Sequence, residues 1–218
     1  MVYLLGVDDA GRGPIIGPMV IAGVILNEEN EFFLKKLGVK DSKQLSQYKR
    51  KKIIESLENK INYFFQIISP KEIDSSNNLN ILEAERMAIV INKLSLEKKD
   101  EKIRVFVDCP SNNKNKWSDL LKNLIIRKDL EFFIEHKADI TYPVVSTASI
   151  FAKEKREEEI YKIKKEYNVE FGSGYPSDPL TISFIEKNFK NKKYENIIRY
   201  SWESIKRLIQ KEKQQKLF

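Results

Sequence analysis

The chain has 218 residues, of which 41% are hydrophobic and 33% are charged. This length suits one domain with at most a small appendage, and the composition is that of a soluble globular protein, so a disordered chain is not expected. The formal net charge is +7, with 16 Lys and Arg against 11 Asp and Glu after residue 151, which favours a polyanionic partner. A solvated, lysine-rich helix face is the alternative source of this charge.

Two rare residue types limit the possible chemistry. The single cysteine, Cys109, excludes an internal disulfide, and the single histidine, His136, excludes a multi-histidine metal site and argues against a serine or cysteine triad. Any catalysis is therefore expected to use carboxylates. The sequence shows no signal peptide and no apolar run of membrane-spanning length, so we expect a cytoplasmic protein without membrane contact.

The first half of the chain predicts a hairpin, a helix and a third strand. Residues 3–7 form a short apolar run interrupted by a polar pair, and residues 19–26 form a second, β-branched run that suits a hairpin partner. A helix is predicted over 43–59 with Ser42 as its N-cap, and a strand is predicted over 61–68.

The second half alternates helices and strands. Apolar positions recur at helical spacing over 79–96, and a compact apolar strand is predicted over 103–107. A helix over 117–127, a strand over 131–134 and a long, charged helix over 148–167 follow. Strands gathered early and helices interleaved with later strands indicate an α/β layer. A loop rich in glycine, serine and proline then leads to short helices at the end of the chain.

Four carboxylates lie at the ends of predicted strands or just beyond them. Asp8 and Asp9 follow the first strand, Asp108 ends a later one, and Asp139 lies between the last strand and the long helix. Ligands of open α/β sheets usually bind at such strand ends. Adjacent aspartates at the edge of a core repel each other, and Mg²⁺ or Mn²⁺, which prefer oxygen ligands, would remove that cost. Each residue alone also fits an ordinary turn or cap; the four together fit two-metal phosphodiester hydrolysis.

Five sequence blocks stand out along the chain. They read GVDDAGRGP at 6–14, KDSKQL at 40–45, VDCPS at 107–111, EHKAD at 135–139 with YPVVSTASI at 142–150, and GSGYPSD at 172–178. In this order they resemble the motifs of ribonuclease HII in its archaeal form. Because the blocks span residues 6–178, coincidence is a poor explanation.

This resemblance implies a fold, an activity and a set of ligands. The fold would be ribonuclease H-like, with a central mixed sheet flanked by helices over 1–168 and a C-terminal helical segment over 169–218 that helps to hold the duplex. The activity would be metal-dependent endonuclease cleavage of the RNA strand of RNA–DNA hybrids, and incision at ribonucleotides embedded in duplex DNA. Cleavage would leave 3′-hydroxyl and 5′-phosphate ends. The cellular role would lie in DNA replication and repair. Two Mg²⁺ or Mn²⁺ ions would be held by Asp8, Asp9, Asp108 and Asp139.

The resemblance also assigns residues to the ribose. Gly11, Arg12 and Gly13 would bring main-chain groups close to the 2′-hydroxyl, which distinguishes RNA from DNA. The ring of Tyr175 would pack against the deoxyribose that follows the scissile ribonucleotide. Without the family resemblance, a tight turn and a partly buried core aromatic would be the ordinary interpretations of these residues.

Other polar residues are weaker candidates. Lys43 and Lys153 are proposed to contact phosphate, although lysine on a helix surface is commonly only solvated. Ser146 and Ser149 are expected to pack and hydrogen-bond inside the fold, because no base is available to activate them. His136 is expected to be structural or to lie near the active site.

Two features depart from the family pattern. The family has glutamate after its first aspartate, where this chain has Asp9, so the ligand is shorter by about 1.5 Å. Residues 214–218 resemble part of a sliding-clamp peptide but lack its spacing and second aromatic, so a frayed polar helix end is the alternative. A monomer is expected. The rival functions are another nuclease of the same fold and a catalytically silent duplex-binding protein.

Overall fold

The computed structural model describes residues 1–39 and 45–215, with side chains described through residue 210. The chain forms two compact units, which are considered separately. The first comprises Met1–Ala10, Val20–Gln66 and Asn78–Lys155, and the second comprises Gly11–Met19, Ile67–Asn77 and Arg156–Phe218. The chain therefore passes between the units several times.

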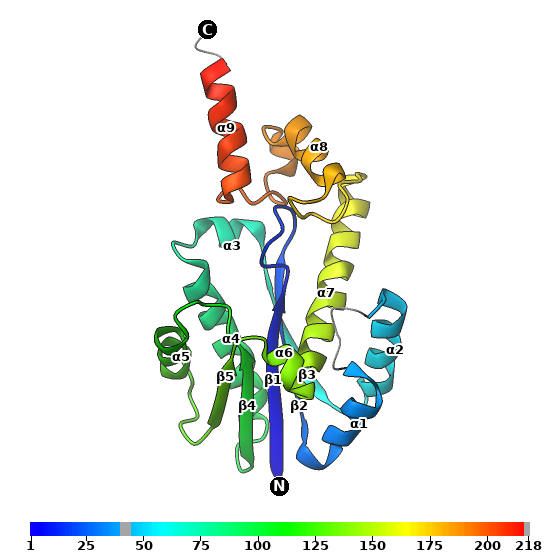
Figure 1. Ribbon diagram of the computed structural model, residues 1–218, viewed down its shortest axis with the longest axis vertical. Coiled ribbons are helices and arrows are strands. Elements are labelled where there is room, and N and C mark those ends of the chain that lie inside the picture. Colours follow the sequence, from blue (N-terminus) through cyan, green and yellow to red (C-terminus); the bar gives the residue numbers. More distant parts are fainter. Residues whose placement is uncertain (40–44, 216–218) are drawn as a thin grey trace. The chain divides into compact units, whose positions relative to one another are not determined.

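One mixed sheet forms the centre of the first unit. Its strand order among the described residues is β3-β2-β1-β4-β5, with β1 antiparallel to β2 and parallel to β4, and β4 parallel to β5. In Figure 1 the green strand β4 lies beside the blue strand β1, and β5 lies beyond β4. The strands are β1 (Val2–Ala10), β2 (Met19–Asn27), β3 (Asn62–Ile68), β4 (Lys102–Asp108) and β5 (Glu131–Glu135). The mixed sheet flanked by helices confirms the predicted fold class.

The polar pair does not interrupt the first strand, so this prediction was wrong. β1 continues through both aspartates to Ala10 because β2 pairs with it along this stretch, with Asp9 opposite Ile21 and Ala10 opposite Val20. The ladder hydrogen bonds satisfy the main chain whatever the side-chain polarity. The predicted hairpin itself is confirmed.

Helices cover both faces of this sheet. A Cβ added at Gly6 would lie 2.4 Å from the main chain of Val144, which shows that the start of α7 (Pro143–Tyr167) packs directly on β1. A Cβ at Gly23, on the opposite face, would lie 2.3 Å from Val90 of α4 (Leu79–Leu96). The other helices of this unit are η1 (Glu28–Asn30), α1 (Glu31–Lys36), α2 (Gln47–Leu57), α5 (Lys114–Asn123) and α6 (Ala138–Thr141).

Several helix starts differ from the predicted ones. The first long helix begins at Gln47 instead of residue 43, because the Ser46 side chain caps it by accepting from the Lys49 main-chain N–H. The predicted cap, Ser42, lies outside the described residues. The α5 and α7 helices begin earlier than predicted, at Lys114 and Pro143.

The second unit is built from the turn after β1, α3 and the C-terminal helices. A Ser69–Glu72 capping box starts the short helix α3, which was not predicted from the sequence. The buried core of the second unit includes Ile15, Ile16 and Phe171. The helices are α3 (Pro70–Ser75), the second part of α7, α8 (Pro179–Asn188), η3 (Lys192–Tyr194) and α9 (Glu203–Gln215). Across the part of the chain that the structure describes, no helix is both long and apolar enough for a bilayer.

Candidate active site

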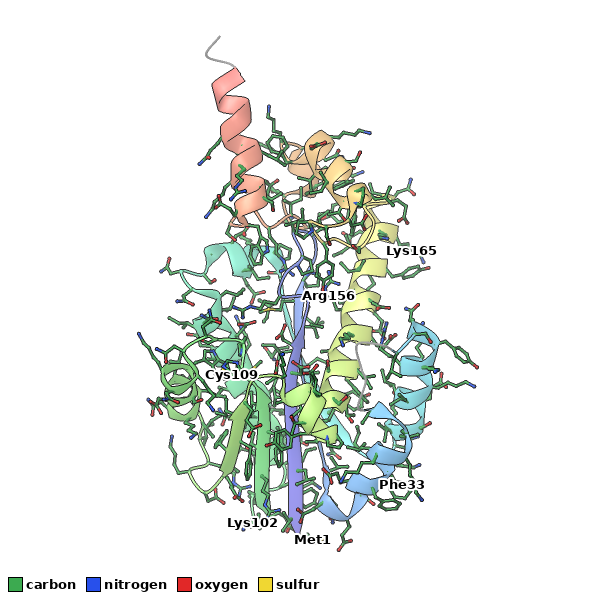
Figure 2. The ribbon with its side chains drawn as sticks, viewed as in Figure 1. Met1, Phe33, Lys102, Cys109, Arg156 and Lys165 are labelled. Carbon is green, nitrogen blue, oxygen red and sulfur yellow. The ribbon has the colours of Figure 1, made fainter. Side chains whose placement is uncertain are left out.

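Two aspartates lie on neighbouring parallel strands of the first unit, Asp8 inside β1 and Asp108 at the end of β4. Val7 of β1 is paired with Val107 of β4, so Asp8 and Asp108 follow at the same level of the sheet. Paired positions on adjacent strands direct their side chains to the same face. Figure 2 labels Cys109, the first residue after β4. The sheet therefore brings these two sequence-predicted residues together.

The environment of Asp8 disfavours a negative charge. Its side chain is buried, at 5% exposure. Burial raises the pKa of the Asp8 carboxyl well above its ordinary value, and the charges of Asp9 and Asp108 raise it further. Hydrogen bonds from Ser149 and from the Asp9 main-chain N–H, the latter at 2.8 Å, act in the opposite direction. A positive charge nearby would therefore stabilise the ionised carboxylate.

Asp139 follows a contact that ties α6 to the end of β4. The main-chain N–H of Ala138 donates to Oδ1 of Asp108 at 2.7 Å, so the Asp108 carboxylate caps the first turn of α6. Asp139 is the next residue and is buried, at 4% exposure. The cap thus fixes where the Asp139 main chain lies relative to Asp108.

Asp9 differs from the other three acids in its surroundings. It is only partly buried, and side-chain alternation along β1 directs it away from the face that Asp8 uses. Within residues 1–39 and 45–215, no three carboxylate, imidazole or thiolate groups are already arranged to hold a metal ion. The donor chemistry does fit a hard divalent cation, because all four candidates offer carboxylate oxygens and the Asp8 charge lacks solvation. Binding would require one or more side chains to rotate.

The residues assigned to the ribose lie together in the second unit. Gly11 has a φ of +86°, a conformation that favours glycine, and a Cβ there would lie 2.3 Å from the Arg156 side chain. A Cβ at Gly13 would lie 3.7 Å from the Tyr175 ring. The Arg156 guanidinium lies 5.4 Å from the centre of the same ring. Gly13 and Tyr175, which are 162 positions apart in the sequence, therefore lie near each other, with Arg156 beside both motifs.

The loop that presents Tyr175 is held at both ends. Ser173 donates to Asp178 Oδ2 through its main-chain N–H at 2.6 Å and its hydroxyl at 2.8 Å. These hydrogen bonds lower the pKa of the Asp178 carboxyl. The Ile15 main-chain N–H donates to the Gly174 carbonyl at 2.8 Å. The Tyr175 side chain remains 39% exposed, so its ring is accessible and is not a buried core residue.

Of the two lysines predicted to contact phosphate, the structure describes one. Lys43 lies outside the described residues. Lys153 lies on the part of α7 that belongs to the first unit and is partly buried. Its assignment to phosphate stays a prediction.

The remaining polar candidates form hydrogen bonds inside the first unit. Ser146 and Ser149 are buried, and they hydrogen-bond to the Val39 carbonyl and to Asp8 respectively, which confirms the prediction of internal packing. Nδ1 of His136 lies 3.1 Å from the carbonyl oxygen of Cys109, the residue after Asp108.

Sequence reasoning missed three residues that shape the second unit. Arg156 is buried within a helix of many charges, and no local pattern distinguishes it from its solvated neighbours. Arg199 and Asp74 contact segments far away in the chain. Long-range contacts of this kind leave no periodic signal in a single sequence.

Comparison with known proteins agrees with this architecture. The model of one family, Ribonuclease HII, matches residues 5–205. A Ribonuclease HII of Methanocaldococcus jannaschii is 43% identical over 98% of this chain and 98% of its own length. The crystal structure of the ribonuclease H2 of Pyrococcus horikoshii superposes with a TM-score of 0.85 at 38% identity, covering 96% of this chain and 98% of that one. The RNase HII in a PCNA:RNase HII complex from Archaeoglobus fulgidus superposes with a TM-score of 0.80 at 34% identity, covering 92% and 95%.

The mixed sheet with acidic strand ends places the protein in the ribonuclease H-like class of nucleases. Within that class, the chain belongs to the ribonuclease HII family of the archaeal type. It is therefore a ribonuclease H, a hydrolase that acts on the RNA of RNA–DNA hybrids and belongs to a divalent-metal-dependent family.

Proposed function

We propose that the protein cuts the RNA strand of hybrids internally and also incises duplex DNA at single embedded ribonucleotides. In the proposed reaction a water oxygen bonds to phosphorus and the bond between phosphorus and O3′ breaks. A proton passes to the leaving oxygen, which gives a 3′-hydroxyl and a 5′-phosphate. The position of the Tyr175 ring, which would lie 3.7 Å from a Cβ added at Gly13, is the observation that supports incision at a ribonucleotide most directly.

The aspartates of the first unit would hold two divalent ions, Mg²⁺ or Mn²⁺. When bound, such ions activate water and stabilise the charge that develops on the leaving oxygen. The contribution of the chain is positioning: β1 and β4 fix the main chain of Asp8 and Asp108, while the Ala138 N–H orients one oxygen of Asp108. The Ser149 hydroxyl orients Asp8 in the same way. Asp9 and Asp139 would complete the ligand set.

The second unit would recognise the sugar. The main chain of Gly11, Arg12 and Gly13 offers groups that can hydrogen-bond a 2′-hydroxyl, and the absence of a Cβ at the two glycines allows close approach. The exposed ring of Tyr175 would pack against the next, deoxyribose sugar. A sugar that must fit both the main chain and the ring is selected by shape as well as by hydrogen bonding.

The positive charge would hold the duplex backbone. We assign phosphate contacts to Lys43 and Lys153, within a chain whose net charge is +7. Such contacts make binding depend on salt but not on base sequence.

A sliding clamp is a further proposed partner. One similar solved structure is a complex of PCNA with RNase HII. In this chain the candidate segment is residues 214–218, whose last three residues lie outside the described part of the structure.

A cleavage assay on three duplexes would test the proposal. The substrates are an end-labelled DNA duplex with one ribonucleotide, the same duplex without it, and an RNA–DNA hybrid, each with Mg²⁺, Mn²⁺ or chelator. Metal-dependent incision only where ribose is present, with 3′-hydroxyl ends, is the expected result. Equal cutting of the all-DNA duplex would indicate a nuclease that does not sense ribose. Binding without incision would indicate a silent duplex-binding protein.

A further inference from the structure

The carbonyl groups of the Gly11–Gly13 segment are all held by residues from the C-terminal part of the second unit. Nη2 of Arg199 donates to the Gly11 carbonyl at 2.8 Å, and Nη1 donates to the Arg12 carbonyl at 3.1 Å. The indole N–H of Trp202 donates to the Gly13 carbonyl at 3.2 Å. Two side chains thus fix three consecutive carbonyls.

Arg199 itself is fixed more firmly than a surface arginine. Its side chain is fully buried, at 0% exposure, and its Nε donates to the Gly17 carbonyl at 2.8 Å. Its main-chain N–H donates to the Ile15 carbonyl at 2.9 Å. Removing a guanidinium from water is unfavourable unless its donors are satisfied, so this position depends on the carbonyls that it contacts.

The turn that bears Arg199 and Trp202 has its own anchor in α3. The Asp74 carboxylate accepts hydrogen bonds from the main-chain N–H groups of Tyr200 and Ser201, at 2.7 and 2.9 Å. The Ser201 hydroxyl also donates to it, at 2.6 Å. The orientation of Arg199 therefore derives from a braced turn, not from a mobile tail.

Fixing a carbonyl also fixes the amide that follows it. A peptide unit is planar and trans, so its N–H points opposite to its C=O. Because the carbonyls of Gly11 and Arg12 point toward Arg199, the N–H groups of Arg12 and Gly13 point away from it. These two N–H groups are among the main-chain groups that the proposed function assigns to the ribose.

We propose that Arg199 is a positioning residue for ribose recognition: it sets the direction of the main-chain N–H groups of Arg12 and Gly13, with help from Trp202. The inference rests on the proposed function, because it presumes that this segment senses the 2′-hydroxyl. Selectivity for RNA then depends on a side chain that contacts no substrate.

The chain offers a matched control for this proposal. The Arg127 side chain is also little exposed, at 8%, and besides its ion pair with Asp129 it also donates to three main-chain carbonyls, those of Ser95, Lys98 and Glu101. These carbonyls belong to the first unit and to no residue assigned to substrate. Arg127→Met therefore removes the same kind of clamp without touching the ribose segment.

The test compares Arg199→Met, Arg199→Lys, Trp202→Phe and Arg127→Met with the wild type. Steady-state kcat and KM are measured on a duplex with one ribonucleotide and on the all-DNA duplex, with melting temperatures and Mn²⁺ affinity measured in parallel. A misplaced reactive geometry can reduce rate by about 100-fold. We expect a kcat loss of about that size for Arg199→Met on the ribonucleotide substrate, with little change in KM or in Mn²⁺ affinity. Arg199→Lys, which can reach fewer carbonyls, and Trp202→Phe should lose less.

The outcomes separate the inference from the proposed function. If the wild type cuts both duplexes equally, the proposed ribose recognition fails. If the wild type discriminates and Arg199→Met keeps its kcat and its preference, the inference fails. It also fails if Arg127→Met, at a similar loss of melting temperature, loses as much kcat. Should Arg199→Met not fold, Arg199→Lys and Trp202→Phe decide: wild-type kcat in both would overturn the inference, and graded loss of kcat without loss of Mn²⁺ affinity would support it.

Discussion

Replacing Asp8 by asparagine should stabilise the metal-free protein while abolishing its activity. Asparagine keeps the size of the side chain and can still accept the hydrogen bond from the Asp9 N–H, but it removes the buried charge. Burial, followed by the charges of Asp9 and Asp108, raises the pKa of the Asp8 carboxyl. The folded state therefore binds this proton more tightly than the unfolded state does. Stability contributed by the protonated form is lost as the pH rises through the folded-state pKa, and at neutral pH the charge is a net cost.

The size of the effect follows from linkage. For a single group, each pH unit by which the folded pKa exceeds the unfolded one corresponds to about 1.4 kcal/mol at neutral pH. For a protein of this length, 1 kcal/mol corresponds to about 2–4 °C in melting temperature. We expect Asp8→Asn in chelator at pH 7 to melt several degrees above the wild type, and the difference to shrink as the pH falls toward the ordinary pKa of aspartate.

Divalent ions should make the wild type melt at a higher temperature than Asp8→Asn. An ion that binds only the folded state adds about 2.7 kcal/mol at 100 times its dissociation constant. Adding Mn²⁺ should raise the melting temperature of the wild type and change that of Asp8→Asn much less. Melting curves by circular dichroism from pH 5 to 8, with chelator or Mn²⁺, provide the measurement, and Asp119→Asn on the exposed surface of α5 is the control. A wild type as stable as Asp8→Asn in chelator at pH 7, or an equal response of both to Mn²⁺, would refute the reasoning.

Three further changes have defined outcomes. Gly6→Ala should lower stability by about 1–3 kcal/mol in thermal unfolding, because its Cβ would lie 2.4 Å from the α7 main chain; unchanged stability would contradict that packing. Asp9→Glu should retain or raise cleavage in a metal titration, since the longer side chain restores reach, whereas a large loss would show that Asp9 is matched to its own site. Deleting residues 214–218 should abolish retention by an immobilised sliding clamp without lowering hybrid cleavage; full retention would exclude this segment.

Much of the fold was predictable because it depends on local pattern. The helix over 79–96 was predicted with its observed bounds, since its apolar positions recur at helical spacing and its ends lie in polar turns. Strand pairing overruled local polarity at Asp8 and Asp9, which is why β1 extends beyond its apolar residues. The start of α2 was misplaced because Ser42 and Ser46 have the same capping chemistry, and the sequence does not distinguish them.

The residue types of the candidate site could be predicted from the sequence, but the hydrogen bonds that hold these residues in place could not. The aspartates were predicted because carboxylates after apolar strands are unusual and matched known motifs. The support of Asp8 by Ser149, and of the Gly11–Gly13 carbonyls by Arg199, depends on tertiary contacts between distant segments. A lone buried arginine or serine looks like any other in the sequence, because only the folded chain reveals which carbonyl or carboxylate it contacts.

The central claim is that Asp8 and Asp108, on the adjacent strands β1 and β4, support metal-dependent cleavage of RNA. The most direct measurement is the rate of cleavage of a labelled RNA–DNA hybrid by the wild type, Asp8→Asn and Asp108→Asn, in Mg²⁺, Mn²⁺ or chelator, with hybrid binding measured alongside. We predict cleavage of the RNA strand by the wild type only when a divalent ion is present, and a loss of at least about 100-fold in both variants while the hybrid is still bound. Cleavage that persists in chelator, or a wild-type rate in either variant, would contradict the account.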